Sequence, residues 1–167
     1  SGKRYFVHKG LFDDVDAALS HHPSSMNIAS LKSSNTISGA RFHYHGQSSH
    51  AAGNPEAGRS ALDAVELMNV GVNYLREHII PEARIHYVIE SGGGQPNVVP
   101  DYANSWYYIR APERDMLEPI KQRVMKIAEG AALMTDTKLV AEMSAGGVHK
   151  IPSKVLSEIV TSNMRKV

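Results

Sequence analysis

The order of strand-like and helix-like segments limits the fold more than any other feature of this sequence. Four segments have the alternation, or the aromatic and β-branched composition, of strands: residues 37–46, 84–90, 103–111 and 138–144. Two segments repeat apolar residues every three or four positions, as amphipathic helices do: about 55–78 and about 113–135. The order strand, helix, strand, strand, helix, strand is that of the ferredoxin-like arrangement. We therefore predict an α+β fold, a four-stranded antiparallel sheet with two helices on one face.

Local signals refine the boundaries of these elements. Asn54, Pro55 and Glu56 have the cap, the early proline and the acid of a helix start. Pro119 predicts that the second helix either begins near Met116 or is kinked. Outside this core, the sequence predicts a short strand over 26–34, otherwise irregular structure over 1–34, and a last helix over 152–167.

Composition excludes several classes of function. The net charge is +1, which gives no electrostatic basis for nucleic-acid binding. The chain has no cysteine, so disulfides and zinc–thiolate sites are excluded. No apolar run approaches the roughly 20 residues of a membrane helix, and the start "SGKRYFVHKG" lacks the apolar stretch of a signal peptide. We expect a cytoplasmic protein without a membrane partner, and the missing initiator methionine indicates a piece of a longer chain.

Three polar residues in or beside loops are candidates for chemistry. His50 lies in the small-residue run "GQSSHAAGNPEAGRSALDA" and is either a surface histidine or a hydrogen-bond donor to an oxyanion. Asn97, in "GGGQPNVVPD", is either a turn residue or an amide that binds a carboxylate or carbonyl. Arg110 ends "WYYIR" and either forms a surface ion pair or holds a substrate carboxylate.

No complete metal site can be assembled from the sequence. His43 and His45 lie two residues apart on one predicted strand and point to the same face, but no third ligand is apparent nearby. His21 and His22 are adjacent, so at most one of them would serve a given metal. A zinc site needs three or four ligands.

Four motifs in order give the chain a family resemblance that covers nearly its whole length. They are "GLFDDVDAALSHHP", "GQSSHAAGNPEAGRSALDA", "GGGQPNVVPDYANSWYYIRAP" and "AEGAALMTDT". Together they resemble the zinc-type amidohydrolases and metallopeptidases, a family that includes aminoacylases and carboxypeptidase G. The resemblance implies a catalytic domain with two metal ions and an inserted ferredoxin-like domain that forms dimers. Residues 35–148 would be that inserted domain, and residues 1–34 and 149–167 would be flanking parts of the catalytic domain.

The resemblance also implies roles for single residues. His50 would reach into the active site of the partner subunit, in a homodimer or heterodimer, and stabilise the oxyanion. Asn97 and Arg110 would bind the substrate's carboxylate end, and His22 would ligate one metal, zinc or manganese in the full-length enzyme. The family's other metal ligands and its general base have no counterpart in this chain.

The expected function follows from these matches and gaps. The whole enzyme would cleave an amide bond of a small carboxylate-bearing substrate, of the aminobenzoyl-glutamate or N-acyl amino acid type. This segment alone is expected to be inactive and to hold no metal stably. The alternative is a non-catalytic module of ferredoxin-like fold that dimerises or binds a small molecule.

Overall fold

The computed structural model describes residues 2–144 and 146–166 and divides the chain into two compact units. Residues 35–149 form one unit, and the flanking stretches 1–34 and 150–167 form the other, with Ser1 and Val167 outside the described residues.

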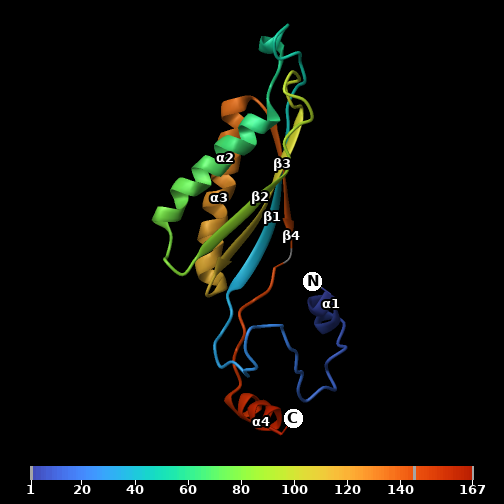
Figure 1. Cartoon of the computed structure of the whole chain (residues 1–167), viewed down its shortest axis with the longest axis vertical. Coiled ribbons are helices and arrows are strands. Elements are labelled where there is room, and N and C mark those ends of the chain that lie inside the picture. Colours follow the sequence, from blue (N-terminus) through green and yellow to red (C-terminus); the bar gives the residue numbers. More distant parts are fainter. Residues whose placement is uncertain (1, 145, 167) are drawn as a thin grey trace. The chain divides into compact units, whose positions relative to one another are not determined.

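A four-stranded antiparallel sheet is the centre of the larger unit. Its strands are β1 (Thr36–His45), β2 (Arg84–Ser91), β3 (Tyr102–Ala111) and β4 (Lys138–Ser144), in the order β2-β3-β1-β4. The helices α2 (Ala61–Leu75) and α3 (Arg114–Thr135) both cover the same face of the sheet, as Figure 1 shows. The predicted ferredoxin-like α+β fold is confirmed.

The core lies between this sheet and the two helices. Alternate residues of the central strands point into it, so Phe42 and Tyr44 of β1 are buried while Arg41 and His45 lie on the open face. Phe42 meets Tyr107 of β3 edge to face, with ring centroids 5.6 Å apart. Each helix contributes a buried stripe, which in α2 is Ala61, Ala64, Val65, Met68, Asn69, Val72 and Leu75.

Two tyrosine hydroxyls inside this core are hydrogen-bonded. The Tyr44 hydroxyl donates to the carbonyl of Ala128 at 3.1 Å, and the Tyr107 hydroxyl donates to the side-chain oxygen of Asn69. Burial raises the pKa of Tyr44 and of Tyr107 above the ordinary value, so both stay neutral donors. Satisfied pairs of this kind avoid the cost of a buried polar group without a partner.

The predicted element boundaries were wrong in two places and right in a third. Pro55–Ala57 form only a 3-10 turn, and α2 begins after Ser60, whose hydroxyl accepts from the Asp63 amide. The second helix, predicted over about 113–135, is α3, which begins at Arg114 and not near Met116. It runs through Pro119, which cannot make the bond to the carbonyl four residues earlier. The segment 26–34 is not a strand, since no neighbouring strand is available to pair with it.

The smaller unit has two helices and little core. They are α1 (Gly2–His8) and α4 (Lys154–Met164), of which α4 was predicted and α1 was not. The Ser33 hydroxyl donates to the carbonyl of Lys150 at 2.6 Å and ties the two flanking stretches together. No side chain described in this unit is buried, and several large apolar ones are exposed. Among all the described residues, no helix has both the length and the apolar composition to cross a lipid bilayer.

One buried and one exposed methionine provide a test of this core. Met68 is fully buried in α2, whereas Met134 in the last turn of α3 is 67% exposed. We expect Met68→Ala to lower the free energy of unfolding by about 2–5 kcal/mol, since it removes packed atoms and leaves a cavity. Met134→Ala should change it by less than about 0.5 kcal/mol. Urea unfolding followed by circular dichroism measures both, and equal losses would contradict the assigned burial.

Candidate functional site

A narrow projection beyond one end of the sheet carries two of the predicted site residues (Figure 1). We call this projection, residues 46–60 together with 92–101, the tip. Its segments are held by backbone hydrogen bonds, between Gln47 and Arg59 and from Val99 to Ser49, each at 2.9 Å. Gly46 is required where they meet, because a Cβ there would lie 1.9 Å from the carbonyl oxygen of Arg59.

His50 lies exposed in the tip, and its ring orientation is fixed by the backbone. The amides of Ala52 and Gly53 donate to its Nδ1 at 3.2 and 3.0 Å. A neutral imidazole that accepts at Nδ1 must carry its proton on Nε2. The loop therefore presents an N–H donor outward, and its small neighbours leave room for an acceptor to approach.

The tip brings Asn97 close to His50. The two segments of the tip form an isolated antiparallel bridge at His50 and Val98, and the carbonyl of Asn97 accepts from the Ala51 amide at 2.9 Å. The Asn97 side chain is exposed and makes no hydrogen bond with other described residues. An imidazole donor and a free amide thus share one end of the larger unit.

Arg110 lies at the opposite end of the same unit. It is the ninth residue of β3, whose first residue, Tyr102, borders the tip. Eight steps along a strand correspond to about 27 Å. Arg110 is exposed on the open face of the sheet and forms no ion pair with the other described residues. Within one copy of the chain, the predicted trio does not converge.

His22 belongs to the smaller unit and is not part of a metal site in the described residues. Its Nδ1 lies 2.9 Å from the carbonyl oxygen of Pro23. The residues that the structure describes contain no group of three or more histidine and carboxylate side chains suited to a metal. On the open face, His43 lies 3.6 Å from Glu142, a pair that is also incomplete as a ligand set.

Sequence analysis missed a network on the open face. Arg41 donates to both carboxylate oxygens of Glu90 at 2.9 and 3.1 Å, and the Asn104 amide donates to Glu90 at 2.7 Å. The Arg41 guanidinium, helped by Asn104, holds the pKa of the Glu90 carboxyl below its usual range. The same guanidinium lies 4.1 Å from the Trp106 ring. Alternation placed some of these residues on one face, but only the strand register brings them into contact.

Comparison with known proteins gives a consistent result. Residues 33–135 match the family model described as the peptidase dimerisation domain. A p-aminobenzoyl-glutamate hydrolase chain of Escherichia coli K12 is 46% identical over 159 residues, 93% of this chain and 33% of that protein. The Xaa-Arg dipeptidase of Mus musculus is 33% identical over 167 residues, 99% of this chain and 38% of that protein. The chain thus spans little more than a third of the length of these relatives.

Solved structures show the same fold. An aminobenzoyl-glutamate utilization protein from Klebsiella pneumoniae matches with a TM-score of 0.64 at 24% identity, over 80% of this chain and 34% of that one. An amidase of the hydantoinase/carbamoylase family from Burkholderia vietnamiensis matches with a TM-score of 0.70 at 15% identity, over 80% and 33%.

The tautomer of His50 is directly measurable. We expect long-range proton–nitrogen NMR correlations to show the neutral ring with Nδ1 bare and Nε2 protonated, because two amides donate to Nδ1. His45 is an internal control, since it is exposed and forms no side-chain hydrogen bond with other described residues. His45 should populate both tautomers. A mixed population at His50 would mean that the loop does not fix its ring.

Proposed function

The chain belongs to the peptidase dimerisation domain family, as its motifs predicted, and we propose that it is the dimer-forming central segment of a metal-dependent amidohydrolase. The whole enzyme cleaves an amide bond in a small substrate that carries a carboxylate, of the aminobenzoyl-glutamate or N-acyl amino acid type. Two features of the structure support the proposal. His50 presents an Nε2–H donor outward from the tip, and Arg110 lies without an ion pair at the far end of the sheet.

Each site residue has a role suited to its chemistry. The Nε2–H of His50 donates to the oxygen that gains negative charge when the amide carbonyl is attacked. The Asn97 amide, next to it, binds a polar group of the same substrate. The Arg110 guanidinium holds the substrate carboxylate, for which its planar fork is suited.

The chemistry assigned to this chain is limited to binding and charge stabilisation. A zinc or manganese ion belongs to the proposal for the whole enzyme, with His22 as one ligand. The residues of this chain do not fit a metal site by themselves, because His22 has no companion ligand among the described residues. The remaining ligands and the general base would come from the rest of the enzyme.

The separation of His50 from Arg110 requires two copies of the chain. A substrate whose carboxylate lies a few ångströms from its amide cannot span about 27 Å. His50 of one copy therefore acts on the substrate that Arg110 of the other copy holds. This arrangement makes the active site dependent on a dimer, or on a heterodimer with a related chain.

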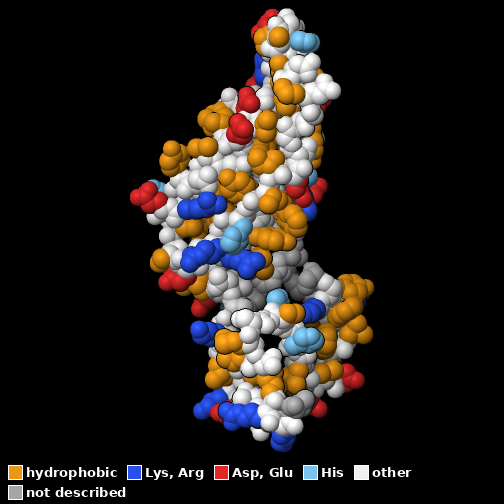
Figure 2. Space-filling model, in the orientation of Figure 1, with side chains coloured by type: hydrophobic (Ala, Val, Ile, Leu, Met, Phe, Trp, Pro, Cys, Tyr) orange, Lys and Arg blue, Asp and Glu red, His pale blue; other side chains and the backbone are white. Residues whose placement is uncertain are grey.

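The outer side of α2 and the edge strand β2 form the surface that we propose for the dimer. Leu67, Val70 and Tyr74 lie three and four residues apart on α2 and are 39%, 49% and 74% exposed. Figure 2 shows hydrophobic side chains gathered over α2. Beside them, β2 has an unpaired edge and exposes Val88 and Ile89. An apolar stripe next to an open strand edge suits a second copy that adds its own edge and stripe.

The smaller unit supports the assignment of residues 1–34 and 149–167 to the catalytic domain. Its exposed apolar side chains include Phe6, Phe12, Leu19, Ile151 and Val155. A unit whose described side chains are all exposed or half-buried gains little from the hydrophobic effect. We propose that the remainder of a catalytic domain covers these side chains.

Mixing two inactive variants of the full-length enzyme tests the action between copies. His50→Ala and Arg110→Ala each remove one member of the site, so each homodimer should lose most of its activity. A mixed dimer keeps one site with both residues intact, and we expect it to recover about half of the unmodified activity. Hydrolysis of an N-acyl amino acid, assayed after the two variants have exchanged partners, measures this. Failure to recover activity in verified mixed dimers would contradict the arrangement.

The dimer surface can be tested with a matched pair of valines. Val70→Glu places a carboxylate in the proposed interface. We expect the dissociation constant of the dimer to rise at least about tenfold, because the carboxylate loses its water on association. Val140→Glu, on β4 at the other edge of the sheet, has a similar exposure of 40% and should leave the dimer intact. Sedimentation velocity of the full-length protein measures both. Dissociation by Val140→Glu alone would place the interface at β4.

A further inference from the structure

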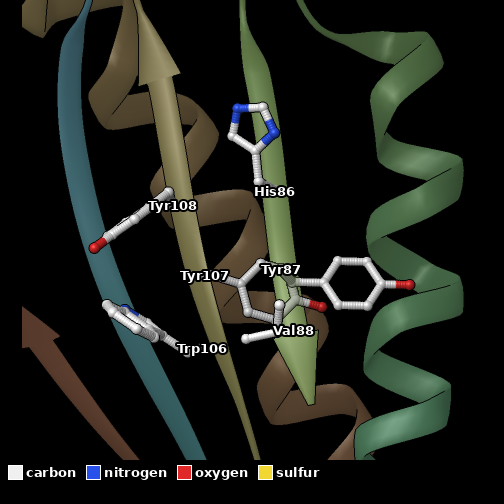
Figure 3. Close-up of a pocket in the computed structure, with 6 residues that line it drawn as sticks. All are labelled: His86, Tyr87, Val88, Trp106, Tyr107 and Tyr108. Carbon is white, nitrogen blue, oxygen red and sulfur yellow. The ribbon is translucent and has the colours of Figure 1, made fainter. Parts of the chain in front are cut away.

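An apolar notch opens on the open face of the sheet, between β2 and β3. His86 and Val88 line it from β2, and Trp106 and Tyr108 line it from β3, as Figure 3 shows. Its floor is the strand backbone at Tyr87 and Tyr107, whose side chains belong to the other face. The notch has a volume of about 170 Å³, and apolar cavities of about 150 Å³ hold a benzene ring. The notch is thus the size of one aromatic ring.

The two aromatic walls of the notch are held in place. The Arg41 guanidinium, on β1, lies over the Trp106 ring. Arg41 is held there by the two hydrogen bonds that it donates to Glu90. Tyr108 meets Trp106 edge to face at 5.1 Å between centroids. Tyr108 is paired with Gly39 of β1, where a Cβ would lie 3.2 Å from the tyrosine ring, so glycine leaves room for it. A preformed slot needs little rearrangement to accept a flat ligand.

Positive charge lies immediately beside the notch. Arg84 and Arg110 are opposite each other in the register of β2 and β3, one step along the open face from His86 and Tyr108. Like charges directly opposite each other on a sheet are destabilising. Neither arginine forms an ion pair within residues 2–144 and 146–166. The Arg84 Nη1 donates to the carbonyl oxygens of Pro81 and Ala83, so its other N–H groups and the Arg110 guanidinium remain available to an anion.

We propose that the notch and the two arginines together bind an aromatic ring linked to a carboxylate, as in an N-aroyl amino acid. The ring lies between Trp106 and Val88, and the carboxylate lies at Arg110 with Arg84 as a second cationic partner. The proposal rests on the proposed function for the role of Arg110 and for a carboxylate-bearing substrate. It goes further by placing the ring of the acyl group in the notch and by giving Arg84 a role.

The spacing of the two parts suits such a ligand. Residues two apart on one face of a strand are separated by about 7 Å, so the notch beside Tyr108 is one such step from Arg110. Ordinary bond lengths put the ring centre of an aroyl amino acid about 6 Å from its α-carboxylate carbon, which is close to this separation. A purely aliphatic acyl group would leave the aromatic walls exposed to water.

Trp106 provides a direct readout in the full-length protein, because its share of the fluorescence is the share that Trp106→Phe removes. We expect N-benzoyl-glutamate to change its fluorescence saturably. N-acetyl-glutamate, which lacks the ring, and benzamide, which lacks the carboxylates, should bind at least about tenfold more weakly. Equal affinity for all three compounds, or no saturable change with the benzoyl compound, would overturn the proposal.

Two tyrosines of β3 provide a matched pair of variants. Tyr108 and Tyr102 lie on the same face and are each 36% exposed, but only Tyr108 lines the notch. Tyr108→Ala should weaken N-benzoyl-glutamate binding by about three- to tenfold, and Tyr102→Ala should leave it unchanged. Equal weakening by both variants would overturn the assignment of the notch. Arg84→Met should weaken N-benzoyl-glutamate binding and leave benzamide binding unchanged.

Kinetics of the full-length enzyme separate this proposal from the proposed function. Tyr108→Ala should lower kcat/KM for N-benzoyl-glutamate by about three- to tenfold more than for N-acetyl-glutamate. An equal loss for both substrates would overturn the notch proposal and leave the hydrolase assignment standing. Absence of hydrolysis of any N-acyl amino acid would count against the proposed function, and the fluorescence titrations would still decide whether the notch binds an aromatic acid.

Discussion

The ten-residue antiparallel pairing of β1 with β3 is the constraint on which the rest of this structure depends. It runs from Thr36 opposite Ala111 to His45 opposite Tyr102 and forms the middle of the sheet. This register decides which side chains enter the core and which form the open face. It also places the tip at one end of the sheet, because the tip follows His45 of β1 and precedes Tyr102 of β3. Arg110 lies near the other end of the same pairing.

Much of this architecture was predictable because strands and helices have different apolar periods. The four strands, the helices α2, α3 and α4, and the two faces of β1 followed from those periods. The start of α2 was wrong because Asn54 and Pro55 resemble a cap, while Ser60 makes the actual capping hydrogen bond. The helix α1 has no acid in its first turn and little polar patterning, so no local signal indicated it.

The site shows a different limit of sequence analysis. The motifs picked out His50, Asn97 and Arg110, and the resemblance already implied that His50 acts in the partner subunit. It did not indicate that Asn97 lies beside His50 and away from Arg110. The notch was invisible too, since it depends on the register that sets His86 opposite Tyr108 and Val88 opposite Trp106. Long-range register is decided by core packing and turns, which single-residue patterns do not encode.

A two-fold axis would bring the tip of one copy, with His50, to the Arg110 end of the other copy. If two copies add their β2 edges in antiparallel fashion, Ser91 of one copy, near the tip, lies towards Arg84 of the other. The same operation carries His50 towards the partner's end of the sheet that holds Arg110 and the notch. An arrangement through β4 would leave two further strands between that edge and β2. The dimer that we propose through β2 is therefore compatible with three features: the apolar stripe on α2, the open edge of β2 and the separation of His50 from Arg110.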